Sequence, residues 1–120
     1  AAAHRPAPRQ LYATHGDYQP RNWLVDGGRL AVIDYGRAGY RPWVTDLVRL
    51  EHGVFAPDGG PLRAAFYAGY GRDPEEEPEA WLLDNLLQSL GTVVWAYEVG
   101  DAAFEDEGRR MVERVLQRWD

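Results

Sequence analysis

The chain has 120 residues, the length of a single domain, and 45% of them are hydrophobic, so it can bury one core. Its formal net charge of −6 and its scattered arginines exclude the basic stripe of a nucleic-acid binder and favour cationic or neutral partners. Cysteine is absent, which excludes disulfides and thiolate metal sites, and no apolar run approaches the roughly 20 residues that span a bilayer, so we expect a cytoplasmic protein without a membrane segment.

The amino-terminal stretch is predicted to enter the fold as extended chain. Residues 1–10 are rich in alanine, proline and arginine without periodicity, and we interpret them as a linker or a cut end. Residues 11–14 form a short strand or turn that leads into His15. Because Pro20 does not fit the interior of a regular helix, the stretch from His15 to Asn22 is predicted to be a loop.

A β-hairpin is predicted directly after this loop. Residues 23–25 and 30–33 are β-prone runs, and an Asp-Gly turn separates them. A hairpin folds the chain back on itself. We therefore expect Asn22, before the first strand, to come close to Asp34, after the second.

The chain after about residue 43 is predicted to be helical. Thr45 and Asp46 are candidate caps of a first helical segment that ends at residues 57–61. Further helices are expected over residues 62–70 and 79–99, and after Asp101.

Two features of these helices carry packing predictions. Gly91 indicates a close contact between helices. The three-to-four spacing of the apolar residues is typical of helices packed on a core. It predicts a core position for four aromatic residues: Trp81, Trp95, Tyr97 and Trp119.

The loop and the hairpin together hold the residue types of a phosphoryl-transfer site. They read His15-Gly16-Asp17-Tyr18-Gln19-Pro20-Arg21-Asn22, then Ile33-Asp34-Tyr35-Gly36. Asp17 offers a proton acceptor, and Asn22 and Asp34 offer two oxygen ligands suited to magnesium. Each residue also has a purely structural alternative. Asp17 could be a surface aspartate in a turn, Asn22 a loop-capping amide, and Asp34 an aspartate at the hairpin end that bonds nearby backbone amides.

This ordered set resembles the aminoglycoside phosphotransferase and choline kinase family, whose members share the protein-kinase-like fold. The resemblance continues to Asp46-Leu47 and, more loosely, to residues 66–71 and 95–101. It implies an α+β, mainly helical fold: the carboxy-terminal lobe of a protein-kinase-like fold with a short β-hairpin beside the catalytic loop. Residues 11–120 would form this catalytic lobe, with the loop and hairpin in 11–36 and a helical substrate-binding part in 43–120.

The resemblance also implies residue roles. Asp17 would accept the proton of the substrate hydroxyl, and Asn22 and Asp34 would bind Mg²⁺ that bridges the phosphates of ATP. His15 would hold the loop by hydrogen bonds rather than act as a base. Asp46 would accept hydrogen bonds from the loop backbone, with ordinary helix capping as the alternative.

Other charged positions leave alternatives open. Gly16 stands where many protein kinases have an arginine, which argues against control by activation-loop phosphorylation. Arg21 and Arg37 either meet phosphate or are solvated. The acids within residues 98–107 either line a pocket for a cationic substrate or form a solvated face.

We therefore expect an ATP-dependent small-molecule kinase that phosphorylates a hydroxyl, with an aminoglycoside as the named candidate. No lysine-bearing strand precedes His15, so the amino-terminal nucleotide lobe is expected to lie outside this chain, which alone would transfer phosphate poorly or not at all. The rival interpretation is a non-catalytic kinase-like interaction module. A metal-dependent hydrolase built on Asp17 and Asp34 would need more ligands than the sequence supplies.

Overall fold

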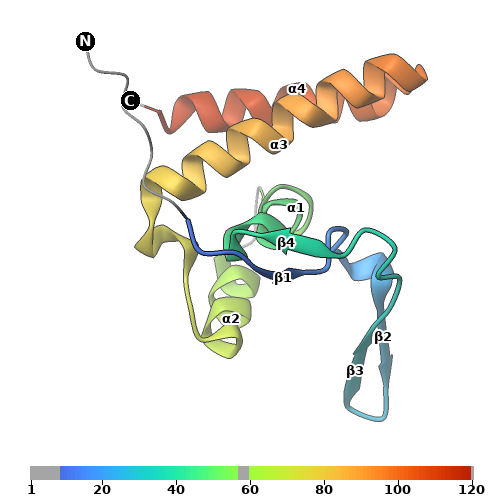
Figure 1. The fold of residues 1–120 in the computed structure, drawn as a ribbon, viewed down its shortest axis with the longest axis vertical. Coiled ribbons are helices and arrows are strands. Elements are labelled where there is room, and N and C mark those ends of the chain that lie inside the picture. Colours follow the sequence, from blue (N-terminus) through green and yellow to red (C-terminus); the bar gives the residue numbers. More distant parts are fainter. Residues whose placement is uncertain (1–8, 57–59, 120) are drawn as a thin grey trace. The chain divides into compact units, whose positions relative to one another are not determined.

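The computed structural model describes residues 9–56 and 60–119 and has an α+β, mainly helical fold with small antiparallel sheets (Figure 1). The chain divides into two compact units, Ala1–Leu47 and Val48–Asp120. Of the expected linker over residues 1–10, residues 1–8 lie outside the described part. Among the described residues, no helix has both the length and the apolar character needed to cross a membrane.

The predicted hairpin is present in the first unit. Strand β2, Trp23–Asp26, pairs antiparallel with β3, Arg29–Val32, and the register sets Trp23 opposite Val32. The two turn residues between the strands, Gly27 and Gly28, have φ angles of 53° and 76°. Two consecutive left-handed residues match the twist of a tight hairpin, and glycine adopts this conformation at little cost.

A second small sheet frames the loop at its other end. Strand β1, Tyr12–Thr14, pairs antiparallel with β4, Gly39–Arg41. β1 was one of two alternatives for its segment, and β4 was not predicted. Three residues carry too little pattern to predict a strand, and the partner that satisfies β4 is 25 or more positions away in the chain.

The segment after β4 differs from the prediction. A 3₁₀ helix spans Trp43–Leu47, so the expectation that Thr45 and Asp46 cap a helix is wrong, because both residues lie inside a helical turn. In the second unit, α1, Val48–Leu50, continues into a π-helical turn over Glu51–Phe55. Residues 57–59 of the predicted break lie outside the described residues.

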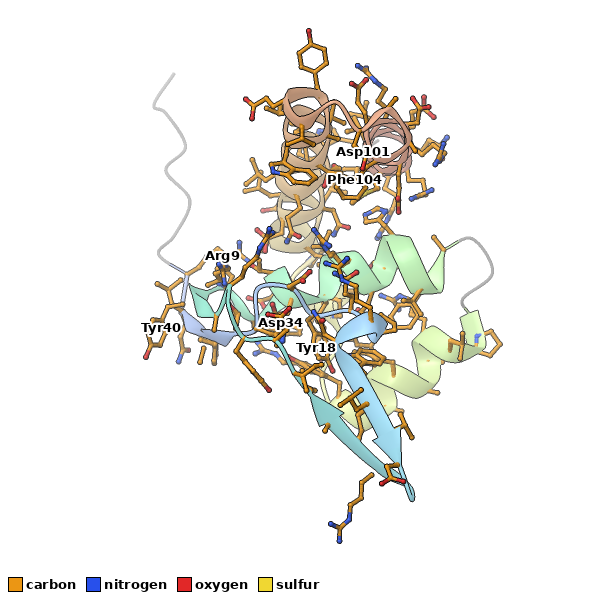
Figure 2. The ribbon with its side chains drawn as sticks, turned by 90° about the vertical axis from the view of Figure 1, so that its right-hand side faces the viewer. Arg9, Tyr18, Asp34, Tyr40, Asp101 and Phe104 are labelled. Carbon is orange, nitrogen blue, oxygen red and sulfur yellow. The ribbon has the colours of Figure 1, made fainter. Side chains whose placement is uncertain are left out.

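The later helices follow the predictions closely. Helix α2, Gly60–Tyr70, is followed by Gly71 with φ of 82°. Helix α3, Pro78–Val99, and helix α4, Ala102–Gln117, lie side by side (Figure 1). The side chain of Asp101 accepts a hydrogen bond from the Phe104 amide at 3.0 Å, so this acid caps α4 at its start (Figure 2).

The aromatic core prediction holds only in part. Trp81 is buried, with 1% of its surface exposed, but Trp95, Tyr97 and Trp119 are 50%, 74% and 53% exposed. Helical spacing identifies an apolar face, but burial requires a partner element on that face. Among the described residues of this unit, the other buried apolar side chains are those of Val48, Leu50, Phe55, Tyr67, Pro74, Ala96, Met111 and Val115.

The close contact between α3 and α4 lies at a different glycine from the predicted one. A Cβ on Gly91 would meet nothing within 4 Å, so the prediction for Gly91 is wrong. A Cβ on Gly108 would lie 2.9 Å from the Val93 side chain and 3.0 Å from the Val93 backbone nitrogen. Glycine at position 108 therefore lets α4 approach the backbone of α3.

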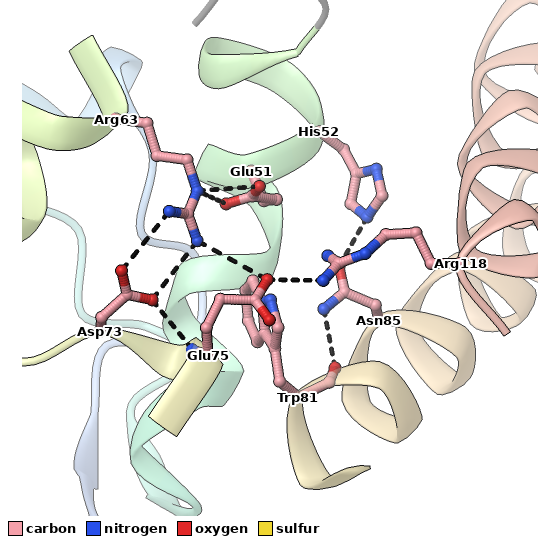
Figure 3. A network of polar contacts seen from close by, with 8 residues as sticks. All are labelled: Glu51, His52, Arg63, Asp73, Glu75, Trp81, Asn85 and Arg118. Atoms are coloured by element: carbon pink, nitrogen blue, oxygen red, sulfur yellow. Dashed lines mark hydrogen bonds and ion pairs between the residues drawn. The ribbon is translucent and has the colours of Figure 1, made fainter. Parts of the chain in front are cut away.

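A polar network links the first helical turns of the second unit to α2 and to the turn before α3 (Figure 3). The Arg63 guanidinium donates to both carboxylate oxygens of Glu51 at 3.1 Å and also pairs with Asp73 at 3.5 Å. Glu75 accepts from Arg118 at 2.6 Å. Burial raises the pKa of Glu51, and the Arg63 charge works against that rise.

His52 belongs to a second polar cluster in this unit (Figure 3). Its Nε2 donates to the Asn85 side-chain oxygen at 2.6 Å, and its Nδ1 accepts from Arg114 at 3.3 Å. Asn85 in turn donates to the Trp81 carbonyl at 2.7 Å. Burial lowers the pKa of His52, and the Arg114 charge adds to this effect while the Asn85 bond opposes it.

The two glycines provide a matched test of helix packing. We expect Gly91→Ala to raise the free energy of unfolding by about 1 kcal/mol, because alanine has the higher helix propensity and the site is open. Gly108→Ala should lower it by about 1 kcal/mol, since overpacking against Val93 outweighs the same propensity gain. Urea unfolding of both variants measures the difference; equal changes would contradict the packing described here.

The depressed pKa of His52 predicts a pH-dependent stability. Because the pKa of His52 is lower in the folded chain than in the unfolded chain, the unfolded chain binds more protons as the pH falls through about 6.5, and stability should fall as the pH drops from 7.5 to 5.5. The loss for one proton is at most about 1.4 kcal/mol per pH unit. In His52→Gln this contribution should vanish. Parallel stability curves for the two proteins in urea at pH 7.5, 6.5 and 5.5 would refute the assignment.

Candidate active site

The loop from His15 to Asn22 joins β1 to β2, as predicted. Thr14 ends β1, and a 3₁₀ turn over Pro20–Asn22 leads directly into β2. Pro20 opens that turn, where its fixed φ is suitable and its missing N–H is not needed. His15, Asp17 and Asn22 are buried, so the polar atoms of the loop must be paired within the protein.

His15 ties the loop to the end of the hairpin. Its Nε2 donates to the Ile33 carbonyl at 2.8 Å, while its Nδ1 accepts from the Asp17 amide at 3.1 Å. Its ring also packs on Tyr35, with centroids 4.6 Å apart. Both ring nitrogens are therefore engaged by backbone, which confirms the predicted structural role and leaves no nitrogen of His15 to act as a base in this conformation.

Asp46 is the anchor of the loop backbone. Its two carboxylate oxygens accept from the amides of His15 at 2.7 Å and of Gly16 at 2.9 Å. The prediction that Asp46 binds the loop is confirmed. Two charge-assisted bonds from consecutive amides fix the direction of the chain immediately before Asp17.

Gly16 occupies a position that no other residue fits. Its φ is +88°, and a Cβ built there would lie 2.1 Å from the Arg37 carbonyl oxygen. The sequence marked Gly16 as a departure from the kinase pattern. The structure supplies the reason: the loop lies directly on the backbone that follows the hairpin.

Arg41 is a positioning residue that the sequence did not single out. Its guanidinium donates to the Thr14 hydroxyl at 2.8 Å and to the Arg37 carbonyl at 3.1 Å. The Thr14 hydroxyl donates in turn to the Gly39 carbonyl at 2.8 Å. These bonds hold in place the backbone around Arg37, against which Gly16 packs. Because strand β4 was not predicted, no signal in the sequence pointed to Arg41.

Asp17 and Asn22, two predicted site residues, are in direct contact. The Asn22 side-chain nitrogen donates to the Asp17 backbone carbonyl at 2.8 Å and to the carboxylate Oδ2 at 3.1 Å. Arg21 also donates to Oδ2 at 3.1 Å, and the Gln19 amide donates to Oδ1. The carboxylate of Asp17 is thus held on both oxygens by residues of its own loop.

Asp34 lies just beyond the end of the hairpin, beside its base (Figure 2). The Ile33 amide donates to the Asn22 carbonyl at 2.9 Å, so the backbone next to Asp34 meets the backbone of Asn22, as the hairpin predicted. Asp34 has φ of +63°, the left-handed region that aspartate tolerates better than most residues. Its side chain is exposed.

Asn22 and Asp34 carry oxygen atoms of the kind that magnesium prefers as ligands. The side-chain nitrogen of Asn22 donates to Asp17, so the side-chain oxygen of Asn22 is not used in that contact. Asp34 adds an exposed carboxylate. Within residues 9–56 and 60–119, no group of three or more His, Cys, Asp or Glu side chains could hold a metal ion. Magnesium commonly takes only one or two protein ligands when it is bound with a nucleotide, so this donor set is suitable.

The two hydrogen bonds that the Asp46 carboxylate accepts from the loop predict a large effect of this residue on stability. We expect Asp46→Ala to lower the free energy of unfolding by about 2 kcal/mol, because two backbone amides lose a charged acceptor. Asp106→Ala is the matched control; this aspartate is exposed on α4, and its replacement should change stability by less than about 0.5 kcal/mol. Equal losses in urea unfolding would contradict the anchoring role.

Comparison with known proteins supplies the family. The model of the phosphotransferase enzyme family, APH, matches residues 1–82, about two thirds of the chain. No curated protein and no solved structure matches significantly. The matched range contains the loop, the hairpin, Asp34 and Asp46. The chain belongs to the phosphotransferase enzyme family.

Proposed function

We propose that this chain carries the catalytic loop of an ATP-dependent phosphotransferase that acts on a hydroxyl group. The observation that carries the proposal is the arrangement around Asn22, whose side chain bonds Asp17 and whose backbone bonds the residue before Asp34. A proton acceptor and two oxygen ligands thus belong to one small framework, in which Asp17 and Asn22 are buried and the Asp34 side chain is exposed. Family membership supports phosphoryl transfer as the reaction class.

In the proposed reaction the substrate hydroxyl binds at the carboxylate of Asp17. Its oxygen forms a bond to the γ-phosphorus while the bond from that phosphorus to the β,γ-bridging oxygen breaks, and the bridging oxygen leaves with its electron pair on ADP. The hydroxyl proton passes to Asp17. Asn22 and Asp34 would hold Mg²⁺, which when bound neutralises charge on the phosphates.

We further propose that residues 11–120 act as the carboxy-terminal lobe of a protein-kinase-like enzyme, with the loop and hairpin in 11–36 and the substrate-binding helices in 43–120. The chain contains no lysine, so a lysine that holds the nucleotide phosphates would have to come from residues outside it. The acceptor is a small-molecule hydroxyl. The net charge of −6 favours a cationic acceptor such as an aminoglycoside.

The proposal predicts magnesium-dependent nucleotide binding that needs Asp34. In calorimetry on the complete gene product, we expect Asp34→Asn to weaken binding of a non-hydrolysable ATP analogue about tenfold or more when Mg²⁺ is present, because a charged metal ligand is lost. With EDTA in place of Mg²⁺, the two proteins should bind equally. Asparagine keeps the size of the side chain and tolerates the left-handed backbone.

Asp26→Asn is the matched control, since Asp26 is an exposed aspartate at the far end of the same hairpin. Its affinity should remain that of the unaltered protein. If the complete gene product binds no nucleotide, the catalytic proposal fails and a non-catalytic interaction module takes its place. That rival is favoured by one observation, the absence of lysine from the chain.

A further inference from the structure

Arg21 is next to Asn22 in the chain and contacts the carboxylate of Asp17. It belongs to the 3₁₀ turn Pro20–Asn22, one residue before the proposed metal ligand Asn22, and its guanidinium lies 3.1 Å from the Asp17 carboxylate. Its side chain is nevertheless 70% exposed. A cation thus lies on the solvent side of the proposed proton acceptor.

The carboxylate of Asp17 already accepts hydrogen bonds on both of its oxygens. Gln19 occupies Oδ1, while Asn22 and Arg21 share Oδ2. A substrate hydroxyl that donates to Oδ2 would compete there with Asn22 and Arg21. Asn22 is buried and also bonds the Asp17 backbone carbonyl. The Arg21 side chain is 70% exposed and donates to Oδ2 through one nitrogen, so it is the donor that can leave with the least rearrangement of the loop.

The chemistry of the displaced group indicates its destination. A guanidinium has five N–H donors in a planar fork, and the bond to Asp17 uses one nitrogen. The fork fits two oxygens of a phosphoryl group, and such bidentate bonds are strong. Because the chain has no lysine, every side-chain cation that it could offer to a phosphate, apart from a protonated histidine, is an arginine.

We propose that Arg21 is a phosphoryl-binding residue that leaves Asp17 for the γ-phosphoryl group of ATP when the nucleotide binds, and so makes room on the carboxylate for the substrate hydroxyl. This inference rests on the proposed function and adds a residue to it. Arg21 then has two partners in turn. It pairs with Asp17 before the substrates bind and with the phosphoryl group afterwards.

The test compares two nucleotides, because only one of them carries the γ-phosphoryl group. In calorimetry on the complete gene product with Mg²⁺, Arg21→Gln should weaken binding of a non-hydrolysable ATP analogue about tenfold or more and binding of ADP less than about twofold. Arg21→Lys keeps the charge without the fork and should give an intermediate loss. The measurement needs no identified acceptor.

Arg29→Gln is the matched control, since it removes one exposed arginine at the turn of the hairpin, and it should leave both affinities unchanged. Equal loss for the two nucleotides in Arg21→Gln, or no loss for either, would overturn the inference while leaving the proposed function standing. Failure of the unaltered protein to bind either nucleotide would refute the proposed function and this inference together.

Discussion

The first unit depends on the hydrogen bonds between the Asp46 carboxylate and the loop backbone. This carboxylate accepts the amides of His15 and Gly16, and so sets the path of the chain at the start of the loop. From there His15 reaches the Ile33 carbonyl, which connects the loop to the end of the hairpin. One carboxylate therefore fixes two backbone amides of the loop. The imidazole of His15 then connects the loop to Ile33, the residue before Asp34.

The same framework explains why the loop tolerates a buried aspartate. A buried carboxylate is costly unless hydrogen bonds and charge compensate it. Asp17 receives bonds from Gln19, Arg21 and Asn22, all within five positions of it. Because these donors come from its own loop, the carboxylate is stabilised locally. In the proposed exchange a substrate hydroxyl replaces Arg21 on Oδ2, where the bond from Asn22 remains.

The second unit is held in a different way. Its helices pack through apolar side chains such as Trp81, and Gly108 allows α4 to approach α3 closely. Its polar contacts gather where short turns meet helices, at Arg63 with Glu51 and at His52 with Asn85. A partly buried ion pair such as Arg63–Glu51 contributes little net stability once desolvation is counted, but it restricts which packing satisfies the buried groups.

The sequence by itself determined the elements that depend on local chemistry. The turn glycines predicted the hairpin, apolar spacing predicted α2, α3 and α4, and Pro20 predicted the loop. The ordered motif predicted the family, which the match to residues 1–82 confirms, and the loop contacts of His15 and Asp46. The roles of Asp17, Asn22 and Asp34 remain predictions.

Only the tertiary structure decided the features that need a distant partner. Strand β4 exists because β1 pairs with it, and Arg41 acquires its role through that pairing. From the sequence alone, Gly91 and Gly108 are equally plausible sites of close helix packing. Only the structure shows that the backbone of α3 faces Gly108, where a side chain would not fit. Trp95 follows core spacing yet is half exposed. Periodicity is a property of one helix, whereas burial and close approach depend on what lies against it.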